Sequence, residues 1–174
     1  MSDGQGSAPA RRDDTRDPRA SRLAALRVLY AADVREMDHL DVLQEELEKQ
    51  ADGGDEELDA ATLDRFAVTL LHGLGATRAD VDARIARFAR GWRLERMPAV
   101  DRNVLRLAVH ELLTEPTPVP VVLDEAVRLA SELSTDDSGR YVNGVLSAIV
   151  KDLRVEAASG GARAAGETTP DSAA

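Results

Sequence analysis

The spacing of the apolar residues is the feature that most constrains the fold of this chain. Leu23, Leu26, Tyr30 and Val34 recur at intervals of three and four, and similar stripes follow through most of the sequence. This spacing places apolar side chains on one face of an α-helix, whereas a half-buried β-strand needs strict alternation. We therefore predict an all-α fold.

The stripes predict about seven helices, with Gly75 ending the third and Thr77 capping the fourth. The expected helices lie near residues 18–34, 41–50, 60–74, 78–92, 99–113, 121–133 and 138–153. Residues 141–146 also resemble a hairpin turn between apolar strands. Helical spacing continues through this run to Ile149 and Leu153, which favours a helix.

Composition divides the chain into one domain and two polar ends. Residues 1–16 and 155–174 are small, polar and charged, so we expect both ends to be disordered. Residues 17–154 are expected to form one helical domain. Apolar residues make up 43% of the chain, but there are only one Trp, two Tyr and two Phe. The core is therefore expected to consist mostly of Leu, Val and Ala.

The net charge of −10 is unevenly distributed along the chain. Residues 11–27 hold six arginines against three aspartates, and residues 78–106 hold eight arginines against four acids. Residues 36–59 hold eleven acids and one lysine. An acidic chain should not bind polyanions over its whole surface, but the basic segments could bind nucleic acid locally. The alternative is that these arginines form ordinary solvated helix faces.

Residues that could support catalysis or metal binding are sparse. The chain has three histidines and no cysteine, which excludes disulfides and thiol chemistry. Glu36 and His39 have the spacing of one di-iron helix motif, but no second copy occurs. No glycine-rich phosphate loop, signal peptide or apolar run of about 18 residues is present. We predict a cytoplasmic protein without catalytic activity, cofactor, metal or membrane span.

Four segments are similar to the NusB family of bacterial transcription antitermination factors. The segments are RLAALRVLY at residues 22–30, WRLERMPAVDRNVLRLAVHELL at 92–113, VPVVLDEAVRLA at 119–130 and STDDSGRYVNGVL at 134–146. The resemblance covers about residues 19–153. It implies an all-α fold of two packed three-helix subdomains, with a helix through residues 141–146. It also implies that Gly144 allows close helix packing.

The resemblance implies a binding function rather than an enzymatic one. NusB proteins bind the boxA element of ribosomal RNA leader transcripts together with NusE, a ribosomal protein, and help RNA polymerase read through terminators. Matched onto this sequence, the implied RNA-binding residues are Arg19, Arg22, Tyr30, Asp137, Ser138, Arg140 and Tyr141. The implied NusE-binding residues are Glu95 and Asp101, whose acidity suits a basic partner. The alternative is that both cap or pair within their own helices.

Arginines and tyrosines suit single-stranded RNA, because arginines pair with phosphates and aromatic rings stack on unpaired bases. Core packing remains the alternative role for Tyr30 and Tyr141, and helix capping is the alternative for Asp137.

The sequence also allows two alternatives to a function in antitermination. A NusB-like domain also precedes the catalytic domain of a ribosomal RNA methyltransferase, but this chain has neither the cysteines nor the glycine-rich loop of such a domain. The other alternative is a helical adaptor or homodimer with weak or no RNA binding. Asp13, Asp14 and Asp17 favour it, because they dilute the basic N-terminal segment.

Overall fold

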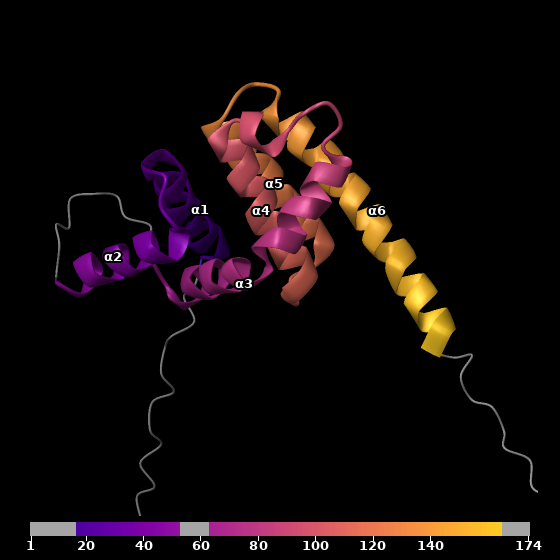
Figure 1. The fold of residues 1–174 in the computed structure, drawn as a ribbon, viewed down its shortest axis with the longest axis horizontal. Helices are drawn as coiled ribbons and strands as arrows, with labels where there is room; N and C mark the ends of the chain where they lie inside the picture. Colours follow the sequence, from indigo (N-terminus) through magenta and orange to yellow (C-terminus); the bar gives the residue numbers. More distant parts are fainter. Residues whose placement is uncertain (1–16, 53–62, 165–174) are drawn as a thin grey trace, which may run out of the picture.

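A computed structural model describes residues 17–52 and 63–164, and these residues form six α-helices and no strand (Figure 1). The helices are α1 (Pro18–Arg35), α2 (His39–Ala51), α3 (Arg65–Phe88), α4 (Ala99–Thr114), α5 (Val119–Leu133) and α6 (Ser138–Ala164), with a short 3-10 turn, η1 (Leu94–Arg96), before α4. The all-α prediction is confirmed. The predictions for residues 1–16 and 165–174 lie outside the described residues.

The helices form two groups of three. Helices α1, α2 and α3 pack on one another, as do α4, α5 and α6, and α1 and α3 both contact α4 (Figure 1). This arrangement confirms the two packed three-helix subdomains. The core consists mainly of Leu, Val and Ala, as expected, and its most buried members include Leu29, Leu43, Leu70, Leu71, Leu105, Leu146 and Ile149.

The prediction of separate third and fourth helices was wrong, because α3 runs without a break through Gly75 and Thr77. Gly75 and Thr77, which were predicted to end one helix and cap the next, have packing roles instead. A Cβ on Gly75 would lie 3.2 Å from Leu40 Cδ1, so this glycine allows α2 to approach. Thr77 Oγ1 donates to the Gly73 carbonyl at 3.1 Å and lies 2.9 Å from Nδ1 of His110. The hydroxyl therefore serves the contact between α3 and α4.

Aspartates begin the first three helices. The side chain of Asp17 accepts a hydrogen bond from the Arg19 amide at 3.0 Å and so caps α1. Asp38 and Asp64 cap α2 and α3 in the same way. Each carboxylate satisfies an amide that has no partner within its helix.

Helix α6 is longer than predicted. It continues past residue 154 to Ala164, and its far end projects from the bundle (Figure 1). An ion pair to α3 holds this extension, with Arg84 Nη2 3.0 Å from Glu156, and Arg87 Nη1 lies 3.1 Å from Asp152 just before it. The helix through residues 141–146 is confirmed.

Candidate functional site

The start of α6 meets the start of α4 through a buried hydrogen bond. Ser138 Oγ donates to Asp101 Oδ2 at 2.8 Å, and the Thr135 hydroxyl lies 2.8 Å from the same Ser138 oxygen. Ser138 and Asp101 are both buried. Ser138, predicted to bind RNA, and Asp101, predicted to bind a protein, are therefore hydrogen-bonded to each other.

The second carboxylate oxygen of Asp101 is left without a hydrogen bond in the described part of the chain. Oδ1 is buried and makes no hydrogen bond among the described residues. It belongs to a residue that lines a cavity of about 280 Å³, together with Trp92, Met97, Asp137, Ser138 and Tyr141. A buried carboxylate oxygen strongly favours a hydrogen-bond donor. A ligand that carries an N–H group could provide that donor.

Two aromatic rings form one wall of this cavity, which we call the aromatic cavity. The centroids of Trp92 and Tyr141 are 6.3 Å apart, and the ring planes are inclined by 58°. Trp92 is 52% exposed, whereas Tyr141 is partly buried and packs against the core. Burial, together with the nearby Asp101 carboxylate, raises the pKa of Tyr141 above its ordinary value. The phenol is therefore neutral at physiological pH and can donate a hydrogen bond.

Sequence analysis did not identify Trp92 as a site residue. Its helical spacing placed it on an apolar stripe, but α3 ends at Phe88 and the chain turns at Gly91, where φ is +82°. The turn carries the indole out of the core. The Gly91-Trp92 pair was the available signal, because glycine permits a left-handed turn that would break the stripe.

Arg22 was predicted to contact RNA directly, but its side chain does not lie at the surface. Its guanidinium forms a two-point ion pair with Glu111 of α4, with Nε–Oε2 at 2.9 Å and Nη2–Oε1 at 2.5 Å. The two side chains are only 6% and 2% exposed. The guanidinium also lies 5.5 Å from the centre of the Phe66 ring. Arg22 therefore holds α1 against α3 and α4.

The other predicted residues of α1 are accessible. Tyr30 is 46% exposed, so the core-packing alternative for it was wrong. Arg19 is partly exposed and pairs with Glu125 and Glu132 of α5, at 3.4 and 2.5 Å. These carboxylates hold the guanidinium beside α5, and a phosphate would have to compete with them.

A polar network fixes the direction of α1 relative to α4. Near the end of α1, Asp33 Oδ2 accepts hydrogen bonds at 2.8 Å from both Arg102 and Asn103 at the start of α4. Arg22 near the start of α1 pairs with Glu111 near the end of α4, so the two helices are antiparallel. Tyr30 consequently lies towards the end of α4 where Ser138 contacts Asp101.

The carboxyl group of Asp33 responds to two opposing influences. Burial acts to raise its pKa, but the hydrogen bonds from Arg102 and Asn103 and the charge of Arg106 together lower the pKa below its ordinary value. Asp33 is therefore ionised at neutral pH and accepts these hydrogen bonds as a carboxylate.

Two predicted residues, Asp137 and Arg140, are exposed near the start of α6. The Asp137 carbonyl accepts a hydrogen bond from the Tyr141 amide at 3.0 Å, so its backbone belongs to the first turn. The structure thus brings Asp137, Ser138 and Tyr141 together around the aromatic cavity, with Arg140 beside them on α6.

The two predicted NusE-binding residues are not brought together in one cavity. Glu95 is exposed on η1, and its nearest ion-pair partner is Arg93 at 3.7 Å. It lines a different depression, beside Asp33 and Arg102, from the one that Asp101 lines. Of the pair, only Glu95 offers its charge at the surface.

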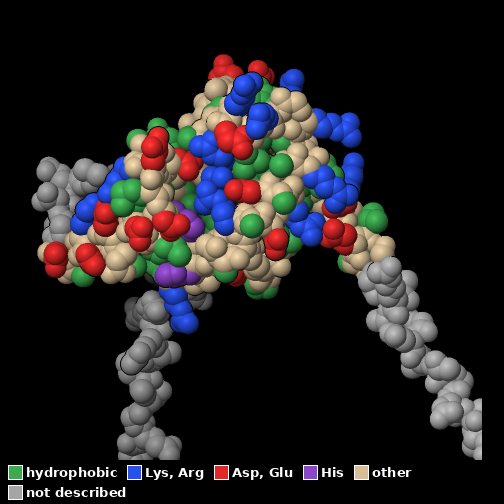
Figure 2. All heavy atoms as spheres, in the orientation of Figure 1, with side chains coloured by type: hydrophobic (Ala, Val, Ile, Leu, Met, Phe, Trp, Pro, Cys, Tyr) green, Lys and Arg blue, Asp and Glu red, His purple; other side chains and the backbone are tan. Residues whose placement is uncertain are grey.

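The surface charge is segregated in space as it is in sequence. Acidic side chains gather over α2, and Lys and Arg side chains are frequent on the side of the molecule near α6 (Figure 2). In the described ranges, no three His, Asp or Glu side chains form a group that could hold a metal ion. No helix within those ranges is long and apolar enough to cross a bilayer.

Comparison with known proteins gives consistent matches. The family model described as the NusB family matches residues 19–151. A transcription antitermination protein NusB of Acidothermus cellulolyticus is 47% identical over 131 residues, which cover 74% of this chain and 83% of the relative. The corresponding protein of Solibacter usitatus is 40% identical over 135 residues, covering 78% of this chain and 89% of the relative.

Solved structures are similar over the same part of the chain. A T. maritima NusB superposes with a TM-score of 0.66 at 34% identity, covering 78% of this chain and 92% of that one. NusB from a crystal structure of the antitermination factors NusB and NusE with double-stranded RNA superposes with a TM-score of 0.63 at 28% identity, covering 78% and 96%.

Proposed function

This chain belongs to the NusB family, and we propose that it acts in transcription antitermination by binding the boxA element of ribosomal RNA leader transcripts together with NusE. The aromatic cavity is the observation that carries this proposal. It combines two aromatic rings with a buried carboxylate oxygen that has no hydrogen-bond partner among the described residues. Unpaired bases are recognised by stacking and by hydrogen bonds to their edges.

The proposed RNA surface consists of the aromatic cavity and the exposed part of α1. Tyr141 would stack on a base, and Asp101 Oδ1, which is buried in the free protein, would become accessible on binding and accept a hydrogen bond from a base N–H group. Each stacked base contributes about 1–3 kcal/mol. Arg140 would contact phosphate, while Asp137 would weaken phosphate binding nearby. Ser138 acts through Asp101, because their hydrogen bond fixes the orientation of the carboxylate.

On α1, Tyr30 would offer a second stacking surface and Arg19 a phosphate contact. Arg22 has a positioning role, because its guanidinium is buried against Glu111. The position of Tyr30 depends on this packing, because the antiparallel arrangement of α1 and α4 places Tyr30 towards the end of α4 that carries Asp101.

The proposed protein partners are NusE and, through it, the antitermination complex of RNA polymerase in the cytoplasm. A chain of net charge −10 attracts a basic ribosomal protein. Glu95 is the exposed acidic residue that we propose as its contact. The proposed role is one of binding, with no reaction assigned to the chain.

Paired substitutions of the tyrosines test the RNA surface. Tyr30→Ala should weaken binding of boxA RNA, in the presence of NusE, without lowering the thermal unfolding temperature, because this side chain is exposed. Tyr141→Leu should also weaken binding, whereas Tyr141→Phe, which keeps the aromatic face, should bind nearly as well as the wild type. If Tyr141→Leu and Tyr141→Phe bind equally, stacking on this ring is not part of recognition.

A further inference from the structure

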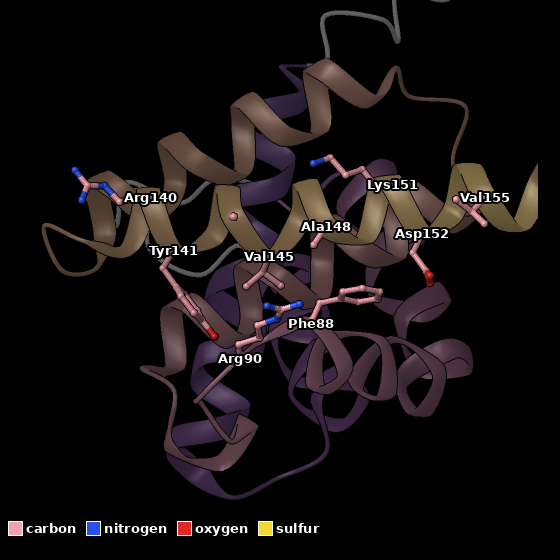
Figure 3. A pocket seen from close by; sticks show the side chains of 10 residues that line it. Phe88, Arg90, Arg140, Tyr141, Val145, Ala148, Lys151, Asp152 and Val155 are labelled. Carbon is pink, nitrogen blue, oxygen red and sulfur yellow. The ribbon is translucent and has the colours of Figure 1, made fainter.

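A second and larger hollow lies beside the aromatic cavity, between the end of α3 and the middle of α6. We call it the α3–α6 groove; its volume is about 650 Å³. Its floor is apolar, with Phe88 below Val145 and Ala148, and Arg90 points into it from the same side as Phe88 (Figure 3). Arg140 lies at one end of the groove and Lys151 on its α6 rim (Figure 3).

The groove offers positive charge that the protein itself does not neutralise. Arg90, Arg140 and Lys151 are exposed, and none of them forms an ion pair within the described part of the chain. The negative charge of Asp152, which lines the groove, is already neutralised, because this carboxylate lies 3.1 Å from Arg87 and 3.7 Å from Arg84. The groove therefore suits an anionic ligand.

Gly144 leaves the backbone of α6 open at the groove. A close helix contact at this position was predicted, and that prediction was wrong: no atom lies within 4 Å of the position of an added Cβ. Glycine inside a helix is unfavourable relative to alanine. No packing among the described residues explains it, whereas the close approach of a ligand to the backbone would.

The groove adjoins the aromatic cavity at Tyr141, which lines both. We propose that single-stranded RNA held at the aromatic cavity continues past Tyr141 into the α3–α6 groove, where Arg90, Arg140 and Lys151 contact its phosphates. This inference rests on the proposed function. Arg140 and Lys151 are about 16 Å apart along the helix, given a rise of about 1.5 Å per residue. The groove would therefore contact nucleotides that flank the recognised element.

An RNA strand fits these observations better than an acidic peptide does. Both carry negative charge, but only RNA is already expected at the adjoining cavity, and a strand that leaves that cavity past Tyr141 enters the groove directly. Positively charged grooves that track a nucleic-acid backbone are the usual means of binding single strands without sequence preference. The groove should accordingly add affinity whatever the flanking sequence is.

The test compares two RNAs, using the full chain with NusE. One is the boxA oligonucleotide alone, and the other carries an oligouridine extension, attached in turn to each end. The wild type should bind one of the extended RNAs more tightly than boxA alone. The Arg90→Ala/Lys151→Ala double variant should abolish this gain and leave the affinity for boxA alone unchanged. It should also reduce the slope of log K against log salt by about 1.4 for the extended RNA, given about 0.7 per phosphate contact on a single strand.

Two further variants separate the groove from general charge and from folding. Arg154→Ala removes an exposed arginine of the same helix that does not line the groove, and it should keep the full gain from the extension. Gly144→Leu should abolish the gain without any change of charge, because its side chain would fill the groove. Thermal unfolding of each variant establishes that it is folded.

The possible failures are distinguishable. If the wild type binds neither RNA with NusE present, the proposed function fails, and this inference fails with it. If boxA alone is bound but neither extension adds affinity, or if the double variant keeps the gain, the proposed function stands and the groove does not hold RNA. An acidic protein segment would then be the ligand class to examine.

Discussion

Replacing Arg22 with alanine is expected to destabilise the fold rather than to weaken RNA binding selectively. The guanidinium and the Glu111 carboxylate are joined at two points, and their side chains are 6% and 2% exposed. Removing one partner of a buried pair leaves the other charge without compensation, which costs about 3–5 kcal/mol. At about 2–4 °C per kcal/mol for a chain of this size, the unfolding temperature should fall by about 6–20 °C.

The assay is thermal and urea unfolding followed by circular dichroism, with two companion variants. Arg19→Ala removes a more exposed ion pair of the same helix and should cost at most about 1 kcal/mol. The Arg22→Met/Glu111→Leu double variant replaces both charges with apolar side chains and should recover most of the loss, because apolar replacement of a buried pair is often neutral or stabilising.

The outcome that refutes this reasoning is specific. If Arg22→Ala unfolds at the wild-type temperature but binds boxA RNA several-fold more weakly, the guanidinium contacts RNA. In that case the ion pair with Glu111 does not hold α1 against α4.

Three further perturbations test the packing around the site. Gly73→Ala should destabilise the protein by about 1–3 kcal/mol in urea unfolding, because the new methyl group would lie 2.5 Å from His110 Nε2; an unchanged midpoint would contradict the close contact. Ser138→Ala should cost about 1–3 kcal/mol, because both Asp101 oxygens would then lack a partner; wild-type stability would show that water replaces the hydroxyl. Burial lowers the pKa values of His39 and His110 below 6.5. The unfolded chain therefore binds protons more readily, so stability should be full above about pH 6.5 and fall towards pH 5; His110→Gln should flatten this dependence, and an equally steep fall in that variant would contradict it.

The helical architecture could be predicted from the sequence because it follows from local patterns. Apolar stripes placed α1, α4 and α5 close to their observed limits. The break at Gly75 was wrong for a tertiary reason. Glycine is an ambiguous signal, and here it serves helix contact rather than helix termination, since Leu40 approaches it closely.

The candidate site could be predicted only in part. The residue types at the start of α6 were identified through the family resemblance, and the structure places them around one cavity. The burial of Arg22 depends on Glu111, which is 89 positions away in sequence, so no local pattern could reveal it. Trp92 was missed because a stripe of apolar residues cannot show where a helix ends.

The measurement that matters most is a titration of labelled boxA RNA with the full chain, with and without NusE, at several salt concentrations. We predict binding that NusE strengthens and that weakens as salt rises, because arginine–phosphate contacts release counterions. Absence of binding at low salt, even with NusE present, would contradict the proposed role in antitermination.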